Sequence, residues 1–306
     1  MAQPILGARA YTKRWFKSRR KTVGASEAAA VLGMSKWRQP LDVYQSKIDG
    51  DQVTPNKAMK RGHDFEAQCL KMYSDRVGGS LYDKVPMLIH PDHEFMSATP
   101  DAIWINDLSV KGKSIFAADY IPVEAKTTES MDEWGAEGTS EIPTDYVIQA
   151  QQHMAVTDTA RCDVPVLFGF PFKLYVVERN EDIIAALVDA EKELIERVAN
   201  EDPPEINWEH PRTPELVKRM YEVTEAVIEL SDEMCERWLE MEGLRDQRGK
   251  LDKQIELIKA EATHEMGAAG IARMRDGREL VRKKQRREAY SVEARDVTSL
   301  RCRKQK

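Results

Sequence analysis

Apolar and polar positions in the first two thirds of the chain alternate between helical and strand-like spacing. Stretches in which apolar residues recur every three or four positions predict amphipathic helices. These stretches are residues 40–50, 56–79, 142–157 and 181–200. A shorter helix is predicted within residues 22–35, where Ser26 stands at an N-cap position and Gly33 closes the helix.

Short apolar runs between these helices predict β-strands. The runs are residues 80–90, 95–105, 116–126 and 162–178, and the last of them is long enough for two strands. This order of helices and strands predicts an α/β domain with a mixed central sheet flanked by helices.

A proline-rich segment divides the chain. We interpret residues 203–213 as a linker. The sequence thus predicts one domain in residues 1–202 and a C-terminal appendage in residues 214–306.

The appendage begins with a heptad pattern. Apolar or small residues follow an alternating four–three spacing through residues 216–262, interrupted only at Arg237 and Arg248. This spacing predicts a coiled coil or a helical hairpin, in which Gly243 and Gly249 would flank the turn.

The end of the chain is strongly basic. Residues 271–306 hold 13 Lys and Arg against 5 Asp and Glu, a net charge of about +8, so the rest of the chain carries about −14. The spacing predicts a β-hairpin that turns at Asp276 and Gly277. A basic tail on an acidic body indicates either a polyanionic partner or an ordinary solvated tail, and the sequence leaves both open.

Composition argues against several classes of protein. No apolar run approaches the roughly 20 residues of a membrane span. The four cysteines are scattered without a C-x-x-C pair, which argues against zinc sites, iron–sulfur sites and a disulfide framework. The first 21 residues lack a secretory core, so we expect mature sequence and a cytoplasmic protein of a bacterium or a phage-infected cell.

A carboxylate and an ammonium stand side by side at the end of the run in residues 116–126. Glu124 and Lys126 are two positions apart, so in a strand they share one face, while Val123 and Ala125 point the other way. Taken alone, such a pair is most often a surface ion pair that contributes about 0–1 kcal/mol.

A second carboxylate changes this interpretation. Asp101 begins a strand 23 residues before Glu124, and pairing of the two strands would bring both carboxylates to the same end. Two carboxylates beside Lys126 can hold a hard divalent cation and orient a water molecule toward a phosphodiester.

The arrangement of Asp101, Glu124 and Lys126 resembles the core motif of the PD-(D/E)xK nuclease superfamily. Four further stretches occur in the order and spacing of the YqaJ-like viral recombinase family, which includes phage lambda exonuclease: TVGASEAAAVLGMSKW, KRGHDFEAQCLKMY, SATPDAIW and YVIQAQQHMAVT. The resemblance covers residues 10–200. It implies a restriction-endonuclease-like nuclease core, and the C-terminal appendage has no counterpart in lambda exonuclease.

The resemblance also implies roles for matching residues at the reacting phosphate. Asp101 and Glu124 would bind the metal, assisted by Glu66 and the carbonyl of Ala125. Lys126 would position and activate the attacking water. The implied cofactor is Mg²⁺, with two ions bound and Mn²⁺ able to substitute.

Other matches lie around this centre. Gln149 would stand close to the reacting phosphate, with Gln151 and Gln152 as competing choices. Arg19 and Ser26 match residues that hold the 5′-phosphate of a DNA end, and Arg20 is a competing choice for Arg19. We interpret the remaining histidines of interest as structural or surface residues: His63, His90, His93 and His153.

The implied activity is cleavage of linear double-stranded DNA from its ends in the 5′→3′ direction. It would leave a 3′ single strand for phage-type recombination. The implied partners are double-stranded DNA ends, a single-strand annealing protein and further copies of the chain in a homo-oligomer, without a membrane. Two alternatives stay open: an endonuclease or junction nuclease of the same fold, and a non-enzymatic DNA-binding assembly protein that acts through the heptad segment and basic tail.

Overall fold

The chain divides into two compact units, Met1–Val223 and Thr224–Lys306. The computed structural model describes residues 3–50, 57–106, 119–221 and 223–284. None of the helices in these ranges has the length and apolarity that crossing a membrane requires.

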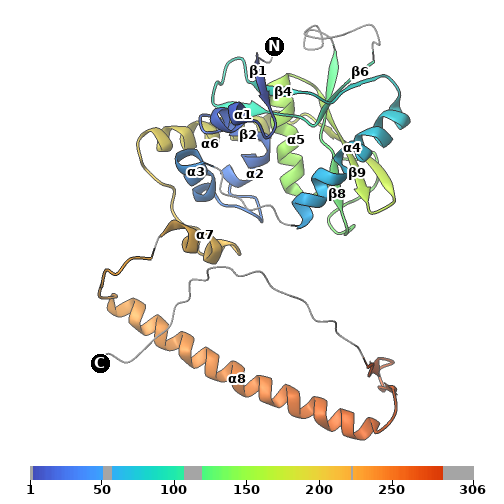
Figure 1. Cartoon of the computed structure of the whole chain (residues 1–306), viewed down its shortest axis with the longest axis vertical. Helices are drawn as coiled ribbons and strands as arrows, with labels where there is room; N and C mark the ends of the chain where they lie inside the picture. The colour runs from blue at the N-terminus through green and yellow to red at the C-terminus, as the bar shows by residue number, and fades with distance from the viewer. Residues whose placement is uncertain (1–2, 51–56, 107–118, 222, 285–306) are drawn as a thin grey trace. The chain divides into compact units, whose positions relative to one another are not determined.

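The first unit combines helices with short strands (Figure 1). Its helices are α1 (Lys13–Arg19), the 3₁₀ turn η1 (Ala25–Glu27), α2 (Ala28–Val31), α3 (Pro40–Asp49), α4 (Lys57–Val77), α5 (Thr144–Thr157), α6 (Glu181–Ala199) and α7 (Thr213–Met220). Its strands are β1 (Gln3–Arg9), β2 (Val23–Gly24), β3 (Ser80–Tyr82), β4 (Pro86–Ile89), β5 (Met96–Ala98), β6 (Ala102–Ile105), β7 (Tyr120–Val123), β8 (Lys126–Thr128), β9 (Arg161–Phe168) and β10 (Phe172–Glu178).

The strands form two mixed sheets. One sheet has the order β1-β4-β5-β2, and the other has the order β10-β9-β7-β6-β3 with β8 also paired to β9. Most neighbours are antiparallel, whereas β2–β5, β7–β9 and β8–β9 are parallel. The prediction of a mixed α/β fold with helices flanking the sheets is confirmed.

Helix α5 is the centre of the first unit. It packs against strands of both sheets and against α2 and α6, and residues 148–157 are all buried. A helix enclosed on every side is normally apolar, but this one carries Gln149 and His153. Buried polar side chains need hydrogen-bond partners, and these two residues find theirs in the candidate active site.

Two of the predicted strands are interrupted in the structure. The run in residues 80–90 contributes β3 to the six-stranded sheet and β4 to the four-stranded sheet, and the run in residues 95–105 is divided in the same way between β5 and β6. Pro100 stands in the break between β5 and β6, and Pro86 is the first residue of β4, where proline is tolerated. Strand β1 was not predicted.

The first unit extends past the predicted linker. Leu216 of α7 is buried, and Gln39 Nε2 donates a hydrogen bond of 2.9 Å to Thr213 Oγ1. His210 Nε2 lies 2.9 Å from the carbonyl of Ser35. The expected boundary at residue 203 is therefore too early, because these contacts fix residues 207–216 to the first unit.

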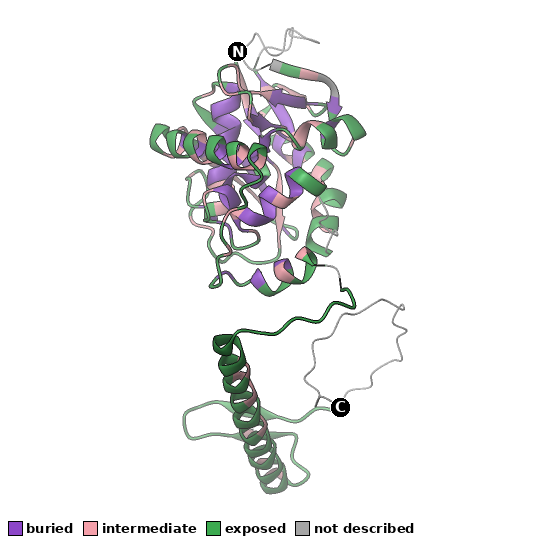
Figure 2. Cartoon of the chain, turned by 90° about the vertical axis from the view of Figure 1, so that its left-hand side faces the viewer, coloured by how far each residue is buried: buried purple, intermediate pink, exposed green. Residues whose placement is uncertain are grey.

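The second unit contains one long helix. Helix α8 (Asp232–Met266) begins after Ser231, whose side chain accepts the N–H of Met234. It continues through Gly243 and Gly249, so the helical-hairpin alternative is wrong. Its residues are largely exposed (Figure 2), including the heptad residue Leu251; the coiled coil stays a prediction.

A short hairpin follows α8. Strands β11 (Ile271–Arg273) and β12 (Glu279–Val281) pair antiparallel around the predicted turn at Asp276 and Gly277. The predicted hairpin is confirmed here, and residues 285–306 of the predicted basic segment lie outside the described residues.

Candidate active site

Strands β6 and β7 bring the two central carboxylates to one end of the six-stranded sheet. Ala102 pairs with Val123 in antiparallel register, so Asp101 and Glu124 stand just beyond the same end of the ladder. Asp101 Oδ2 accepts a hydrogen bond of 2.8 Å from the N–H of Ala125. The predicted meeting of the two carboxylates is present in the structure.

Lys126 lies against Glu124, as the two-residue spacing predicts. Lys126 Nζ is 2.6 Å from Glu124 Oε1, and both side chains are largely buried. Burial alone would lower the pKa of Lys126, but the carboxylates of Glu124 and Asp101 outweigh burial and raise it above its ordinary value. Lys126 is therefore a protonated donor at neutral pH.

Gln149 bridges this ion pair from helix α5. Its Nε2 donates to Glu124 Oε1 at 2.5 Å, and its Oε1 accepts from Lys126 Nζ at 3.1 Å. The competing glutamines have structural partners instead: Gln151 Nε2 donates to the carbonyl of Glu178, and Gln152 Nε2 donates to the carbonyl of Val23.

His153 is a contact that sequence analysis missed. It follows Gln149 by one helical turn and is 1% exposed. Its Nε2 lies 2.9 Å from Glu124 Oε2. Burial opposes ionisation of Glu124, but Lys126 and the hydrogen bond with His153 lower the pKa of that carboxyl. The i, i+4 spacing from Gln149 was the only signal in the sequence.

Glu66 reaches the same place from α4. A hollow of about 180 Å³ is lined by Glu66, Asp101, Glu124, Gln149 and His153. We call it the carboxylate hollow. Burial and the neighbouring Glu124 raise the pKa of Glu66, as expected for two carboxylates that line the same hollow.

The donor set of this hollow fits a hard divalent cation. Among the described residues, no three His, Cys, Asp or Glu side chains are arranged as a preformed metal site. The hollow nevertheless gathers three carboxylates, and oxygen ligands are those that Mg²⁺ takes, usually with several waters retained. Burial, Glu124 and Glu66 raise the pKa of Asp101 well above its ordinary value, as expected for crowded carboxylates that a cation would neutralise.

The predicted phosphate-binding pair also lines the carboxylate hollow. Arg19 Nη1 donates to Ser26 Oγ at 3.3 Å, although seven residues separate them in the sequence. Arg20 does not line this hollow; its Nε donates to the carbonyl of Lys47. The structure thus separates the two competing arginines and brings Arg19 to the carboxylates.

Ser26 is not an N-cap. It lies inside the turn η1, whose N-cap is Gly24, and the side chain of Glu27 accepts the N–H of Gly24 at 2.9 Å. In place of one continuous helix, the structure has η1 followed by the four-residue α2.

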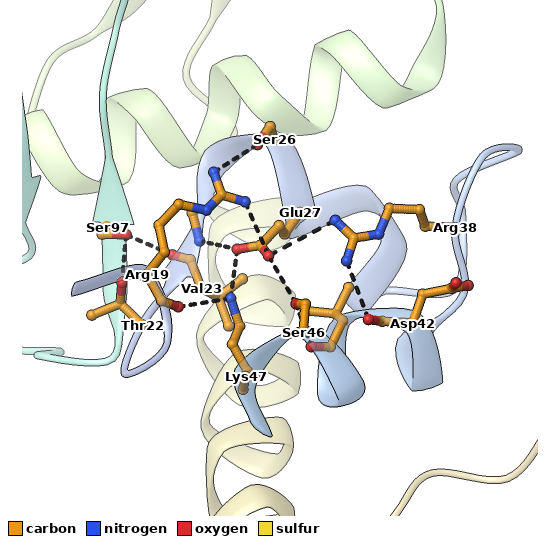
Figure 3. A network of polar contacts seen from close by, with 12 residues as sticks. Arg19, Thr22, Val23, Ser26, Glu27, Arg38, Asp42, Ser46, Lys47 and Ser97 are labelled. Atoms are coloured by element: carbon orange, nitrogen blue, oxygen red, sulfur yellow. Dashed lines mark hydrogen bonds and ion pairs between the residues drawn. The ribbon is translucent and has the colours of Figure 1, made fainter. Parts of the chain in front are cut away.

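Glu27 anchors Arg19 (Figure 3). Its carboxylate is fully buried and lies 3.0 Å from Arg19 Nη2 and 2.7 Å from Lys47 Nζ. Arg38 Nη1 approaches to 3.9 Å. Burial alone would raise the pKa of Glu27, but these three cations hold it well below the ordinary range. Sequence analysis did not single out Glu27.

The fold and this geometry define a mixed α/β domain in which carboxylates, a lysine and an arginine meet around one hollow. Residues 14–160 match the family model described as the YqaJ-like viral recombinase domain. Residues 14–160 are therefore similar to a YqaJ-like viral recombinase domain, which confirms the resemblance seen in the motifs.

Known proteins are similar over most of the chain. Uncharacterized protein YqaJ of Bacillus subtilis (strain 168) is 26% identical over 262 residues, which make up 82% of this chain and 77% of that protein. The crystal structure of LHK-Exo in complex with dAMP is 22% identical with a TM-score of 0.50, covering 68% of this chain and 97% of that one. A crystal structure of LHK-Exo described as an alkaline exonuclease from Laribacter hongkongensis is 21% identical with a TM-score of 0.48 over the same shares. The match at 0.50 shows that the chain shares the fold of LHK-Exo.

Proposed function

We propose that the protein is a divalent-metal-dependent exonuclease that degrades linear double-stranded DNA in the 5′→3′ direction. One observation carries this proposal: the carboxylates of Asp101 and Glu124, with Lys126 paired to Glu124, share a hollow with Arg19 and Ser26. In this proposal, a site for a terminal phosphate would lie next to a site for phosphodiester hydrolysis. The family and the fold of LHK-Exo support a nuclease of the phage exonuclease type.

Asp101 and Glu124 would hold the metal, with Glu66 and the carbonyl of Ala125 as further oxygen ligands. When bound, two Mg²⁺ ions, or Mn²⁺ in their place, would supply the positive charge that stabilises the developing negative charge on the phosphate. His153 and Gln149 hold the two oxygens of Glu124 in a fixed orientation. Such hydrogen bonds to a ligating carboxylate keep it positioned for the cation.

Lys126 would act on the attacking water. Its protonated Nζ lies beside Glu124 and Gln149, from where it would orient the water and stabilise negative charge. The water would lose a proton to solvent as the bond from its oxygen to phosphorus forms. The bond between phosphorus and the 3′-oxygen breaks, and that oxygen leaves with a proton from solvent. The next nucleotide keeps the 5′-phosphate, so the product is a substrate for the following cycle.

Arg19 and Ser26 would bind the terminal 5′-phosphate and set the direction of degradation. A guanidinium beside a hydroxyl offers charge-assisted hydrogen bonds to a phosphate. Repeated removal of nucleotides from the 5′ end would leave a 3′ single strand. We propose a single-strand annealing protein as the partner that receives it, a homo-oligomer as the acting form, and the cytoplasm as the location.

Linear and covalently closed circular duplexes of the same sequence test the dependence on ends. With Mg²⁺, we expect loss of the linear duplex alone, and no loss with Asp101→Ala. Cutting of the circle would favour an endonuclease of this fold. Binding of DNA without any cleavage, unaffected by EDTA, would favour a non-enzymatic assembly protein.

A further inference from the structure

Arg19 lines a second hollow in addition to the carboxylate hollow. This hollow has a volume of about 460 Å³ and is lined by Lys17, Arg19, Arg20 and Lys47, with Glu27 as an acidic side chain. We call it the basic hollow. Among the described residues, it collects four cations from α1, from the residue after α1 and from α3 against one carboxylate.

The single carboxylate does not balance these charges. Glu27 is already bound to Lys47 at 2.7 Å and to Arg19 at 3.0 Å. Lys17 and Arg20 are exposed, and within the described residues neither lies within ion-pair distance of an acidic side chain. In the part of the chain that the structure describes, a net positive charge therefore remains at the opening of the basic hollow.

Arg20 is oriented for binding. Its Nε donates to the carbonyl of Lys47 at 3.3 Å, which holds the guanidinium against α3. Lys47 is fixed in turn, since its Nζ donates to the carbonyl of Arg19 at 3.0 Å. A hollow lined mainly by cations concentrates the electrostatic field, and an oriented guanidinium matches the geometry of a phosphate group.

We propose that the basic hollow binds a backbone phosphate of duplex DNA through Lys17 and Arg20. Arg19, which faces Ser26 in the carboxylate hollow, binds the terminal phosphate instead. Two neighbouring arginines thus have separate tasks: Arg19 recognises the end, and Arg20 holds the duplex whatever its end. The proposal rests on the proposed function only for its ligand, duplex DNA.

The test is equilibrium binding of a linear duplex to the full chain in EDTA, with 5′-phosphate and 5′-hydroxyl ends, over a range of salt concentrations. The variant is Lys17→Gln/Arg20→Gln. The control is Arg14→Gln/Lys21→Gln, which removes an arginine and a lysine from the same segment; both residues are exposed and neither lines the basic hollow. All four side chains are on the surface, so folding is not at risk.

Loss of one phosphate contact should lower the affinity roughly tenfold at about 0.1 M salt and reduce the slope of log K against log salt by about one. The loss of affinity should be equal for 5′-phosphate and 5′-hydroxyl ends, and the control variant should show no such loss. Three results would each overturn the proposal. They are equal losses of affinity in the variant and the control, a loss of affinity confined to 5′-phosphorylated ends, and no binding of duplex DNA by the wild type. If the wild type binds duplex DNA as expected but does not degrade linear duplex with Mg²⁺, the proposed nuclease activity would be refuted. The proposed phosphate site in the basic hollow would not be.

Discussion

Glu27→Gln should destabilise the first unit strongly. The substitution keeps the size of the side chain and removes the only carboxylate that contacts Lys47 in the described structure. Lys47 is 4% exposed and Glu27 is 0% exposed. Burial already lowers the pKa of Lys47, and Glu27→Gln would take from Lys47 and from the partly buried Arg19 and Arg38 the carboxylate that balances their charges.

The expected cost follows from this burial. Breaking a buried ion pair by removing one partner typically costs about 3–5 kcal/mol, because the other charge stays uncompensated. A domain of this kind has a free energy of unfolding of about 5–15 kcal/mol, so the loss would be a large fraction of its stability. By contrast, Glu193→Gln removes an exposed carboxylate that pairs with Arg197 on α6, and its effect should be much smaller.

Urea unfolding of the wild type and both variants, followed by circular dichroism and tryptophan fluorescence, measures these differences. The pKa of Glu27 is depressed in the folded state from about 4.5, so its contribution is complete above that pH and is lost as the pH falls through the folded-state pKa. The gap between wild type and Glu27→Gln should therefore be constant above about pH 5.5 and narrow in acid. A loss below about 1 kcal/mol, or one equal to that of Glu193→Gln, would refute this account of the cluster.

Three further substitutions test the candidate active site. Lys126→Ala should lower the cleavage rate by at least about 10²-fold while duplex binding in EDTA is retained; an equal loss of binding would contradict a role at the reacting phosphate. His153→Ala should lower activity by about 10–100-fold through the orientation of Glu124, measured as kcat on linear duplex, and an unchanged kcat would show that Glu124 needs no such support. Arg19→Ala should reduce kcat/KM on 5′-phosphorylated ends and not on 5′-hydroxyl ends. If the ratio of kcat/KM for the two kinds of end is unchanged, Arg19 does not bind the terminal phosphate.

The grouping of Asp101, Glu124 and Lys126 could be predicted from the sequence because local strand geometry determines where these residues lie. Strand alternation places Glu124 and Lys126 on one face, and pairing of two nearby strands brings Asp101 to Glu124. Gln149 was distinguished from its neighbours only by the family motif. In the structure the distinction has a physical basis, since Gln151 and Gln152 point to backbone carbonyls elsewhere.

Residues whose partners are distant in the sequence could not be predicted. Glu27 looks like an ordinary helix former in an alanine-rich stretch, and only the fold brings Lys47 to it. His153 contacts Glu124 across 29 residues of sequence. Because α5 is buried on every side, its sequence lacks the alternation of apolar and polar positions that would show which face of the helix His153 is on. Helix α7 was assigned to the appendage because Leu216 fits the heptad spacing, although its side chain packs into the first unit.

Release of a labelled nucleotide from each end of a linear duplex tests the central claim most directly. The duplex carries 5′-phosphates and a different label at the 5′ and 3′ end of one strand, and it is incubated with Mg²⁺ or with EDTA. We predict early release of the 5′ label as a mononucleotide with Mg²⁺, none with EDTA, and none with Asp101→Asn. Early release of the 3′ label, or release that persists with EDTA or with Asp101→Asn, would contradict a metal-dependent 5′→3′ exonuclease built on this site.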